Sequence, residues 1–272
     1  MLYSDLNDAC KSLLLTVVGT LNKTKLRYVI AGGWVPLLIE SDHPYLKHPG
    51  TRDVDVLLVD NLESVRLATR ALFENDFRPS AKHEFQLLRN ASVGKQEFVF
   101  NVDLMHPVEN SEPEQMFNDI FDLGVRDDYD PRGSRFAKSI AFRSAKIVYE
   151  KNLFTNIPLL GIDLDENTYE HSIPLLSASA FILSKCESVK IKKRTRDAFD
   201  IYYMLSSSNG RKHASELVSL SQNYRQVHDQ VNILLTFLRD ESMQFNYNVN
   251  IHAHANVENA ANFCFDVLRD VQ

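Results

Sequence analysis

The sequence is poor in cysteine and lacks any long hydrophobic run. Its three cysteines, Cys10, Cys186 and Cys264, are odd in number and have no CxxC spacing. This argues against a disulfide framework or a zinc site and is typical of small core or surface residues in a reducing compartment. No apolar stretch approaches the ~18–20 residues that cross a bilayer, and no secretory leader pattern is present. We therefore expect a cytoplasmic protein with no membrane partner.

A broad positive charge is also missing. The chain has 30 lysines and arginines against 36 aspartates and glutamates, which gives a formal net charge of −6. A protein that coats duplex DNA with its whole surface needs a broad positive field, so the sequence argues against that class but leaves room for a local basic patch. The motifs of serine hydrolases, P-loop proteins and zinc proteases are absent too. With 272 residues, the chain is long enough for one or two globular domains.

Strand-like and helix-like patterns alternate through the first part of the chain. Helical spacing of apolar residues predicts helices at 5–22, 34–40 and 61–76, the last capped by Asn61, and a short helix at 113–122 within the irregular segment 107–134. β-rich runs predict strands at 26–33, 52–60, 83–90, 96–106 and 134–152. From about Ser177 onward the pattern is helical. We therefore expect an α+β domain over residues 1–160 and a helical C-terminal domain over residues 161–272.

Three aspartates fall on the predicted strands. Asp53 and Asp55 are two positions apart and should point to the same face of the sheet. Carboxylates this close repel each other unless a cation lies between them, and Mg²⁺ suits oxygen ligands and substrate phosphates. Asp103 lies on a later strand, and three acids could hold two ions for phosphoryl transfer. Gly32 and Gly33, which end the first strand, let backbone amides approach a triphosphate.

The order of these features resembles the nucleotidyltransferase superfamily built on the polymerase-β-like palm. The matching residues are Gly32-Gly33, Thr51-Arg52-Asp53-Val54-Asp55 and Val102-Asp103-Leu104. The resemblance implies a mixed sheet flanked by helices, with two Mg²⁺ ions on Asp53, Asp55 and Asp103. It also implies that Gly32, Gly33 and Thr51 bind a nucleoside triphosphate (NTP). An acceptor hydroxyl would then attack the α-phosphorus, Asp103 would accept its proton, and pyrophosphate would leave.

A second segment, 177–205, narrows the resemblance. It has Lys185 on one predicted helix, and Arg194, Arg196, Asp197 and Asp200 at the start of the next. This arrangement resembles the Lys…Arg-Asp-x-x-Asp-Leu pattern of abortive-infection nucleotidyltransferase toxins of the AbiE type. The resemblance implies that Lys185 steadies the triphosphate and that Arg194 or Arg196, together with Asp197, contacts the nucleotide. It further implies an RNA acceptor, the 3′ end of tRNA, and an antitoxin protein as partner.

Other interpretations of the same residues stay open. Asp197 and Asp200 could simply order their helix and pair with Lys185. The basic run from Lys190 to Arg196 is either a solvated face or a contact to an RNA backbone. Gly-Gly-Trp-Val with Arg-Asp-Val-Asp also resembles small-molecule nucleotidyltransferases that inactivate aminoglycoside or lincosamide antibiotics, and the negative net charge suits a cationic substrate. A third possibility is a nucleotidyltransferase fold that has lost activity and serves as a binding module.

Overall fold

The chain packs into two units. The computed structural model describes residues 5–59, 62–80, 83, 85–107, 117–122 and 136–271. Met1–Gly33 and Thr51–Leu175 form the first unit, which we call the sheet unit, and Trp34–Gly50 and Leu176–Gln272 form the second, the helical unit. The predicted boundary at residue 160 therefore falls inside a strand of the sheet unit, and a short N-terminal segment belongs to the helical unit.

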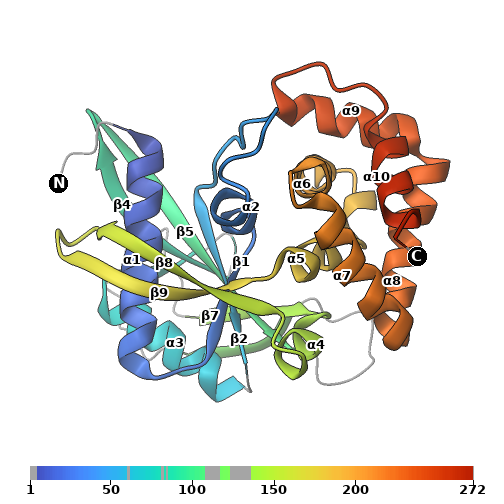
Figure 1. The fold of residues 1–272 in the computed structure, drawn as a ribbon. Helices are drawn as coiled ribbons and strands as arrows, with labels where there is room; N and C mark the ends of the chain where they lie inside the picture. Colours follow the sequence, from blue (N-terminus) through green and yellow to red (C-terminus); the bar gives the residue numbers. More distant parts are fainter. Residues whose placement is uncertain are drawn as a thin grey trace. The chain divides into compact units, whose positions relative to one another are not determined.

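A mixed β-sheet organises the sheet unit (Figure 1). Its strands are β1 (Tyr28–Ala31), β2 (Asp53–Leu58), β3 (Arg78–Pro79), β4 (Gln86–Val93), β5 (Gln96–Pro107), β6 (Phe117–Asp122), β7 (Phe136–Phe142), β8 (Phe154–Ile162) and β9 (Thr168–Leu176). The order across the sheet is β3-β4-β5-β2-β1-β9-β8, and β7 pairs with β5 and β6. β2 runs antiparallel to β1 and parallel to β5, so it is central and flanked on both sides. A central strand needs apolar residues on both faces, and Val54, Val56, Leu57 and Leu58 are all fully buried.

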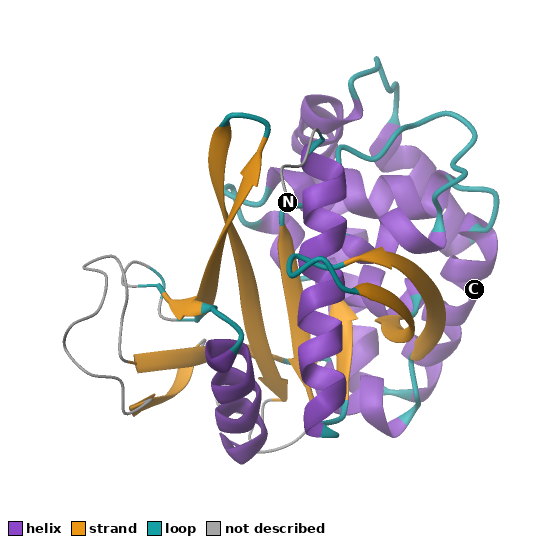
Figure 2. Cartoon of the chain, turned by 90° about the vertical axis from the view of Figure 1, so that its left-hand side faces the viewer, coloured by secondary structure: helices purple, strands orange, loops and turns teal. Residues whose placement is uncertain are grey.

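Helices cover the sheet within the same unit. They are α1 (Leu6–Thr24), α3 (Leu62–Glu74) and α4 (Ala145–Glu150). Figure 2 shows α1 lying over the sheet, nearly along the direction of its long strands. The Asp5 side chain caps its N-terminus by accepting a hydrogen bond from Asn7 N at 2.7 Å, and Lys25 ends it in the left-handed conformation. Leu13, Leu14 and Val17 are completely buried in α1, as expected for a helix that covers a sheet.

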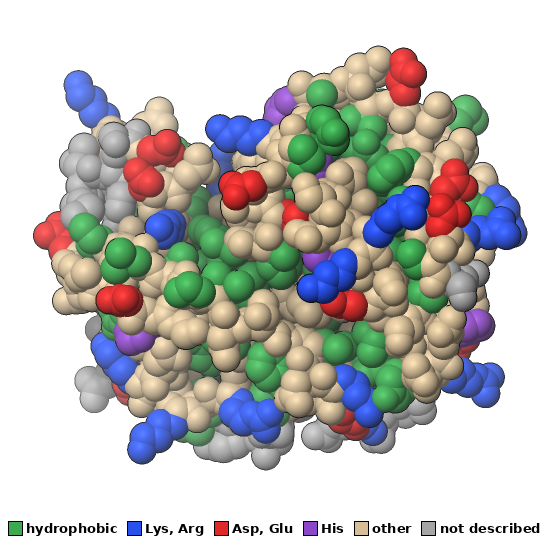
Figure 3. All heavy atoms as spheres, viewed as in Figure 1, with side chains coloured by type: hydrophobic (Ala, Val, Ile, Leu, Met, Phe, Trp, Pro, Cys, Tyr) green, Lys and Arg blue, Asp and Glu red, His purple; other side chains and the backbone are tan. Residues whose placement is uncertain are grey.

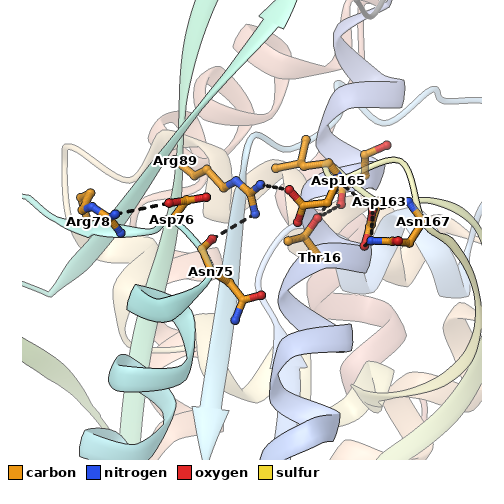
Figure 4. A network of polar contacts seen from close by, with 10 residues as sticks. Thr16, Asn75, Asp76, Arg78, Arg89, Asp163, Asp165 and Asn167 are labelled. Atoms are coloured by element: carbon orange, nitrogen blue, oxygen red, sulfur yellow. Dashed lines mark hydrogen bonds and ion pairs between the residues drawn. The ribbon is translucent and has the colours of Figure 1, made fainter. Parts of the chain in front are cut away.

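A polar network ties the loop between β8 and β9 to neighbouring elements of the sheet unit (Figure 4). Asp163 Oδ1 accepts hydrogen bonds from the backbone N–H groups of Asp165 and Asn167 at 2.9 and 2.8 Å, which closes the loop on itself. Arg89 on β4 pairs with Asp165 and also donates to the Asn75 carbonyl oxygen at 3.1 Å. The loop is thereby fixed to the sheet by side chains rather than by strand pairing alone.

The helical unit is built from seven α-helices and one 3₁₀ turn in the part of the chain that the structure describes. They are α2 (Trp34–Ile39), α5 (Ala178–Lys185), the 3₁₀ turn η1 (Ser188–Lys190), α6 (Thr195–Ser206), α7 (Gly210–Asn223), α8 (Arg225–Asp240), α9 (Ser242–Ala253) and α10 (Ala260–Arg269). Its largest buried side chains include Phe181, Phe199, Tyr203 and Phe245. Glu40, just after α2, accepts a hydrogen bond from Tyr203 through its backbone oxygen at 2.8 Å, and its carboxylate contacts His213 at 2.6 Å. The segment between the two stretches of the sheet unit is thereby attached to α6 and α7.

Most predicted elements are confirmed, and the failures have physical causes. The predicted helix at 113–122 is wrong over 117–122, which forms β6, because pairing with β7 outweighs a weak local preference; residues 113–116 lie outside the described part, as does Asn61. The range 134–152 was predicted as strand only, yet it ends in α4. Strands β8 and β9 were not predicted, and α9 was not singled out as a separate helix within the region predicted to be helical. The three cysteines are free and buried, and none of the helices in the described ranges is long and apolar enough to cross a membrane.

Candidate functional site

Three aspartates meet on one face of the sheet unit. Asp55 and Asp103 are direct partners in the parallel pairing of β2 with β5, and Asp53 is paired with Asn101 two positions earlier. Because side chains alternate along a strand, and partners in a ladder share a face, all three carboxylates belong to the same side of the sheet. Neighbouring strands lie about 4.8 Å apart. Asp103 is buried, and Asp53 and Asp55 are half-buried. The structure thus places Asp53 and Asp55 on one face of the sheet, as the sequence predicts, and brings Asp103 beside Asp55.

The absence of a side chain on Gly32 allows the Asp55 carboxylate to lie against the backbone. Gly32 follows the end of β1, where Ala31 is the antiparallel partner of Asp55. A Cβ atom on residue 32 would lie 1.6 Å from Asp55 Oδ2, and the φ angle of Gly32 is +64°. Both the left-handed backbone and the close approach require glycine. The Asp55 carboxylate therefore occupies the space beside the Gly32 backbone that a side chain would otherwise fill.

Short-range hydrogen bonds orient two of the three acids. Thr51 Oγ1 donates to Asp53 Oδ1 at 2.5 Å, and Asn101 Nδ2 donates to Asp103 Oδ1 at 3.0 Å. Both donors lie two residues before the acid they contact: Asn101 is on β5 together with Asp103, and Thr51 lies just before the start of β2. The Thr51 hydroxyl therefore holds a carboxylate, whereas the sequence predicts a role in nucleotide binding.

The chemistry of these donors fits a hard cation. All three are carboxylates, and Mg²⁺ is usually held by one or two carboxylates while substrate phosphates and water complete its shell. Among the described side chains, no group of three or more His, Cys, Asp and Glu residues is arranged to hold a metal ion by itself. The assignment of Asp53, Asp55 and Asp103 to two Mg²⁺ ions therefore stays a prediction, in which phosphate oxygens supply the remaining ligands.

The helical unit contains a second cluster of charged residues. Lys185, at the end of α5, lies 2.7 Å from Asp197 Oδ1 and 3.5 Å from Asp200 Oδ2. Asp197 is in the first turn of α6, where the helix dipole favours a carboxylate. Its other oxygen, Oδ2, is buried and accepts no hydrogen bond from the described residues. Lys185 therefore pairs with both acids, as expected if Asp197 and Asp200 order their helix and bind this lysine. The roles of Lys185, Arg194 and Asp197 in binding a nucleotide stay predictions.

Arg196 and His48 complete this cluster. Arg196 Nη2 donates to the Gly50 carbonyl oxygen at 2.6 Å, and its Nε lies 3.5 Å from Asp200 Oδ1. His48 Nδ1 accepts from Gly50 N at 3.3 Å, and His48 Nε2 lies 3.4 Å from Asp200 Oδ1. Arg196 Nη2 also lies 3.3 Å from His48 Nε2, so this nitrogen has both a donor and an acceptor close to it. Arg196 is thus engaged by the chain itself, while the Arg194 side chain is exposed.

Burial and charge shift the pKa values of this cluster. Burial lowers the pKa of His48 below 6.5, against the attraction of Asp200. Burial alone would raise the pKa of Asp200, but the hydrogen bond from His48 and the charges of Lys185 and Arg196 outweigh it and hold that pKa below its usual value. A neutral histidine beside an ionised aspartate is therefore the resting state at neutral pH.

Comparison with known proteins yields distant likenesses to solved structures. Neither a protein-family model nor a curated protein sequence matches the chain. The crystal structure of JHP933 from Helicobacter pylori superposes with a TM-score of 0.41 and 10% identity, over 99% of this chain and 94% of that one. A structure from H. pylori described as a candidate nucleotidyltransferase gives 0.40 and 11%, over 96% of each chain. At these values the two structures establish neither an activity nor a substrate for this chain.

Several residues around these clusters were not predicted from the sequence. Asn101 carried a usable signal, because it stands two residues before Asp103 on a strand and must share its face. His48 and Gly50 carried none, since they lie in a polar loop without periodicity. Their contacts with Arg196 and Asp200 join residues about 150 positions apart, and such a contact depends on the fold.

Proposed function

We propose that this chain is a magnesium-dependent nucleotidyltransferase that moves a nucleoside monophosphate from an NTP to an acceptor hydroxyl. The acceptor in this proposal is RNA, the 3′ end of a tRNA, in a toxin–antitoxin or defence setting with an antitoxin protein as partner. The observation that carries the proposal is the register that places Asp55 beside Asp103, with the bare backbone of Gly32 against the Asp55 carboxylate.

The residues of the sheet unit have distinct tasks in this reaction. Asp53, Asp55 and Asp103 would hold Mg²⁺, which when bound neutralises phosphate charge. Thr51 fixes the orientation of Asp53, and Asn101 does the same for Asp103. Asp103 would accept the proton of the attacking hydroxyl, and the absence of a side chain on Gly32 lets the Asp55 carboxylate lie against the backbone. Catalysis of this kind depends mainly on positioning and on stabilising charge.

Two features support RNA as the acceptor. The Lys…Arg-Asp-x-x-Asp arrangement of Lys185 and the start of α6 resembles that of AbiE-type toxins. The exposed side chains of Lys190, Lys192, Lys193 and Arg194 form a short positive segment in a chain with a net charge of −6. Phosphate groups are the partners that such a segment attracts.

The decisive experiment is nucleotidyl transfer by the full chain. The wild type is incubated with Mg²⁺, each α-labelled NTP in turn and total RNA, next to Asp55→Asn, which hardly changes side-chain volume. The matched control is Asp76→Asn, because the Asp76 side chain is 77% exposed and its left-handed backbone suits asparagine. We expect label in a tRNA-sized band with the wild type and the control, and a loss of at least about a hundredfold with Asp55→Asn.

The other outcomes identify what is wrong. Full transfer by Asp55→Asn would mean that the site is misplaced. Mg²⁺-dependent NTP binding without label in RNA would favour an acceptor of another class, such as an aminoglycoside-type antibiotic. Failure to bind any NTP would leave a nucleotidyltransferase fold that acts only as a binding module.

A further inference from the structure

Helix α9 has apolar residues on two opposite faces. Its sequence alternates strictly between apolar and polar residues from Met243 to Ile251, which is the pattern of a strand. On a helix, residues four apart share a face, so this alternation separates into two stripes. One stripe, Phe245, Val249 and Ala253, is 0%, 0% and 5% exposed and packs inside the helical unit.

The other stripe lies in solvent. Met243, Tyr247 and Ile251 are 85%, 65% and 44% exposed, and they follow one another about 6 Å apart along the helix axis. We call these three residues the α9 stripe. No aspartate, glutamate, lysine or arginine occurs between Glu241 and Glu258. A surface helix normally presents polar and charged residues outward, and an exposed, uncharged stripe of this kind marks a binding surface.

A positive segment reaches the same end of α9. Lys190, Lys192, Lys193 and Arg194 are exposed, and no acidic residue lies between Glu187 and Asp197. Thr195, the next residue, is hydrogen-bonded through Oγ1 to His252 Nε2 at 3.0 Å. His252 directly follows Ile251, so the positive segment ends against the helix turn where the α9 stripe ends. Both features belong to the helical unit.

We propose that the α9 stripe and the positive segment together bind single-stranded RNA. The bases would stack on Tyr247 and pack on Met243 and Ile251, and the phosphates would lie along the lysines and Arg194. This combination of an aromatic platform and a cationic track is how proteins hold single strands without reading their sequence. The proposal rests on the proposed function only for the nature of the acceptor, and it adds where that acceptor is held.

The exposed aromatic ring and the positive charge of this surface favour single-stranded RNA over duplex RNA or a second copy of the chain. Duplex RNA keeps its bases stacked inside the helix and offers nothing to an exposed tyrosine. A second copy of the chain, docked by the same surface around a two-fold axis, would bring eight cations towards one another, which is unfavourable. An anionic partner with exposed apolar faces fits both the α9 stripe and the positive segment.

The test measures RNA binding without NTP or Mg²⁺, so it is independent of catalysis. A fluorescein-labelled, unstructured 12-nucleotide RNA is titrated with the full chain and followed by anisotropy, beside the duplex of the same length. We expect Tyr247→Ala to weaken binding at least about fivefold and Tyr247→Phe to retain it, since stacking needs only the ring. The double variant Lys192→Gln, Lys193→Gln should lower the salt slope of binding by about 0.7 for each cation removed.

Tyr45→Ala is the matched control, because Tyr45 is 84% exposed in the same unit but lies outside the α9 stripe. Equal losses for Tyr45→Ala and Tyr247→Ala, tighter binding of the duplex, or Tyr247-dependent self-association in sedimentation would each overturn the proposal. RNA transfer with unchanged affinity in Tyr247→Ala would overturn it while the proposed function stands. Tyr247-dependent binding without any nucleotidyl transfer would support it while the proposed function fails.

Discussion

Gly32 and Gly94 have almost the same backbone conformation in very different surroundings. Their φ angles are +64° and +60°, so a side chain at either position meets the same left-handed strain. At Gly94, in the turn between β4 and β5, an added Cβ has no atom within 4 Å. At Gly32 it would lie 1.6 Å from the Asp55 carboxylate. Substituting each glycine in turn therefore distinguishes the free energy of left-handed backbone strain, common to both positions, from the effect of displacing Asp55, which arises only at Gly32.

We therefore predict different outcomes for the same substitution. Gly32→Ala and Gly94→Ala should each lower the free energy of unfolding by about 1–2 kcal/mol through the left-handed conformation. Only Gly32→Ala should also reduce nucleotidyl transfer, by about a hundredfold, because it moves the Asp55 carboxylate by an ångström or more. Urea unfolding and the transfer assay on both variants check this. Equal transfer rates in the two variants would refute a role for the Gly32–Asp55 contact.

At the scale of elements, the sequence predicts the helices and strands that have a clear local periodicity of apolar residues. Helix α1, the strand carrying Asp53 and Asp55, and the lysine and acids of α5 and α6 all have clear periodicity, and their placement on helices and strands is confirmed. Strand β6 depends on its partner β7, and β9 is joined to β1 by a parallel pairing of Ile30 with Leu175. Such long-range pairing leaves little local signal. Helix α9 has the period of a strand, so its helical state follows from packing inside the helical unit.

The turn from α6 to α7 shows how closely two elements approach. Gly210 is the first residue of α7, and a Cβ on it would lie 1.9 Å from the backbone oxygen of Leu205 near the end of α6. Replacing glycine by alanine in a helix usually stabilises it by up to about 1 kcal/mol. Here the contact is with backbone, which has no free rotamer to move aside, so the sign should reverse.

We predict that Gly210→Ala lowers the free energy of unfolding by about 1–3 kcal/mol, the usual range for overpacking. Ser208→Ala, at an exposed position of the same turn, is the control and should change it by less than about 0.5 kcal/mol. Chemical denaturation monitored by circular dichroism measures both. A Gly210→Ala variant as stable as the wild type would mean that α7 can shift along its axis to relieve the contact.

At the scale of the whole molecule, charged side chains are dispersed, whereas the three histidines whose pKa is lowered by burial all belong to the helical unit. On the face drawn in Figure 3, lysine and arginine side chains are dispersed among acidic and hydrophobic ones, as expected for a net charge of −6 without a broad positive field. Three histidines of the helical unit behave differently. Burial lowers the pKa of His43, His48 and His252 below 6.5. All three resist protonation in the folded chain but accept it readily once unfolded.

The stability of the chain should therefore fall on acidification. Well above pH 6.5, the ordinary pKa of histidine, these side chains are neutral in both states and add no pH dependence. Below that value the unfolded chain binds protons that the folded chain resists, so the free energy of unfolding decreases, by at most about 1.4 kcal/mol per pH unit for each group. Asp200 acts in the same direction at lower pH, because its folded pKa lies below the usual 3.8 and the unfolded chain is protonated first.

His48→Gln isolates the largest buried contribution. The His48 side chain is 2% exposed and contacts both Asp200 and Gly50, so the variant should be less stable at every pH. Its stability should nevertheless change less steeply between pH 6.5 and 5 than that of the wild type, because one proton uptake on unfolding is lost. His228→Gln, whose side chain is 58% exposed, is the control and should keep the wild-type slope. Urea titrations at several pH values measure these slopes, and an unchanged slope in His48→Gln would show that His48 is protonated as readily in the folded chain as in the unfolded one.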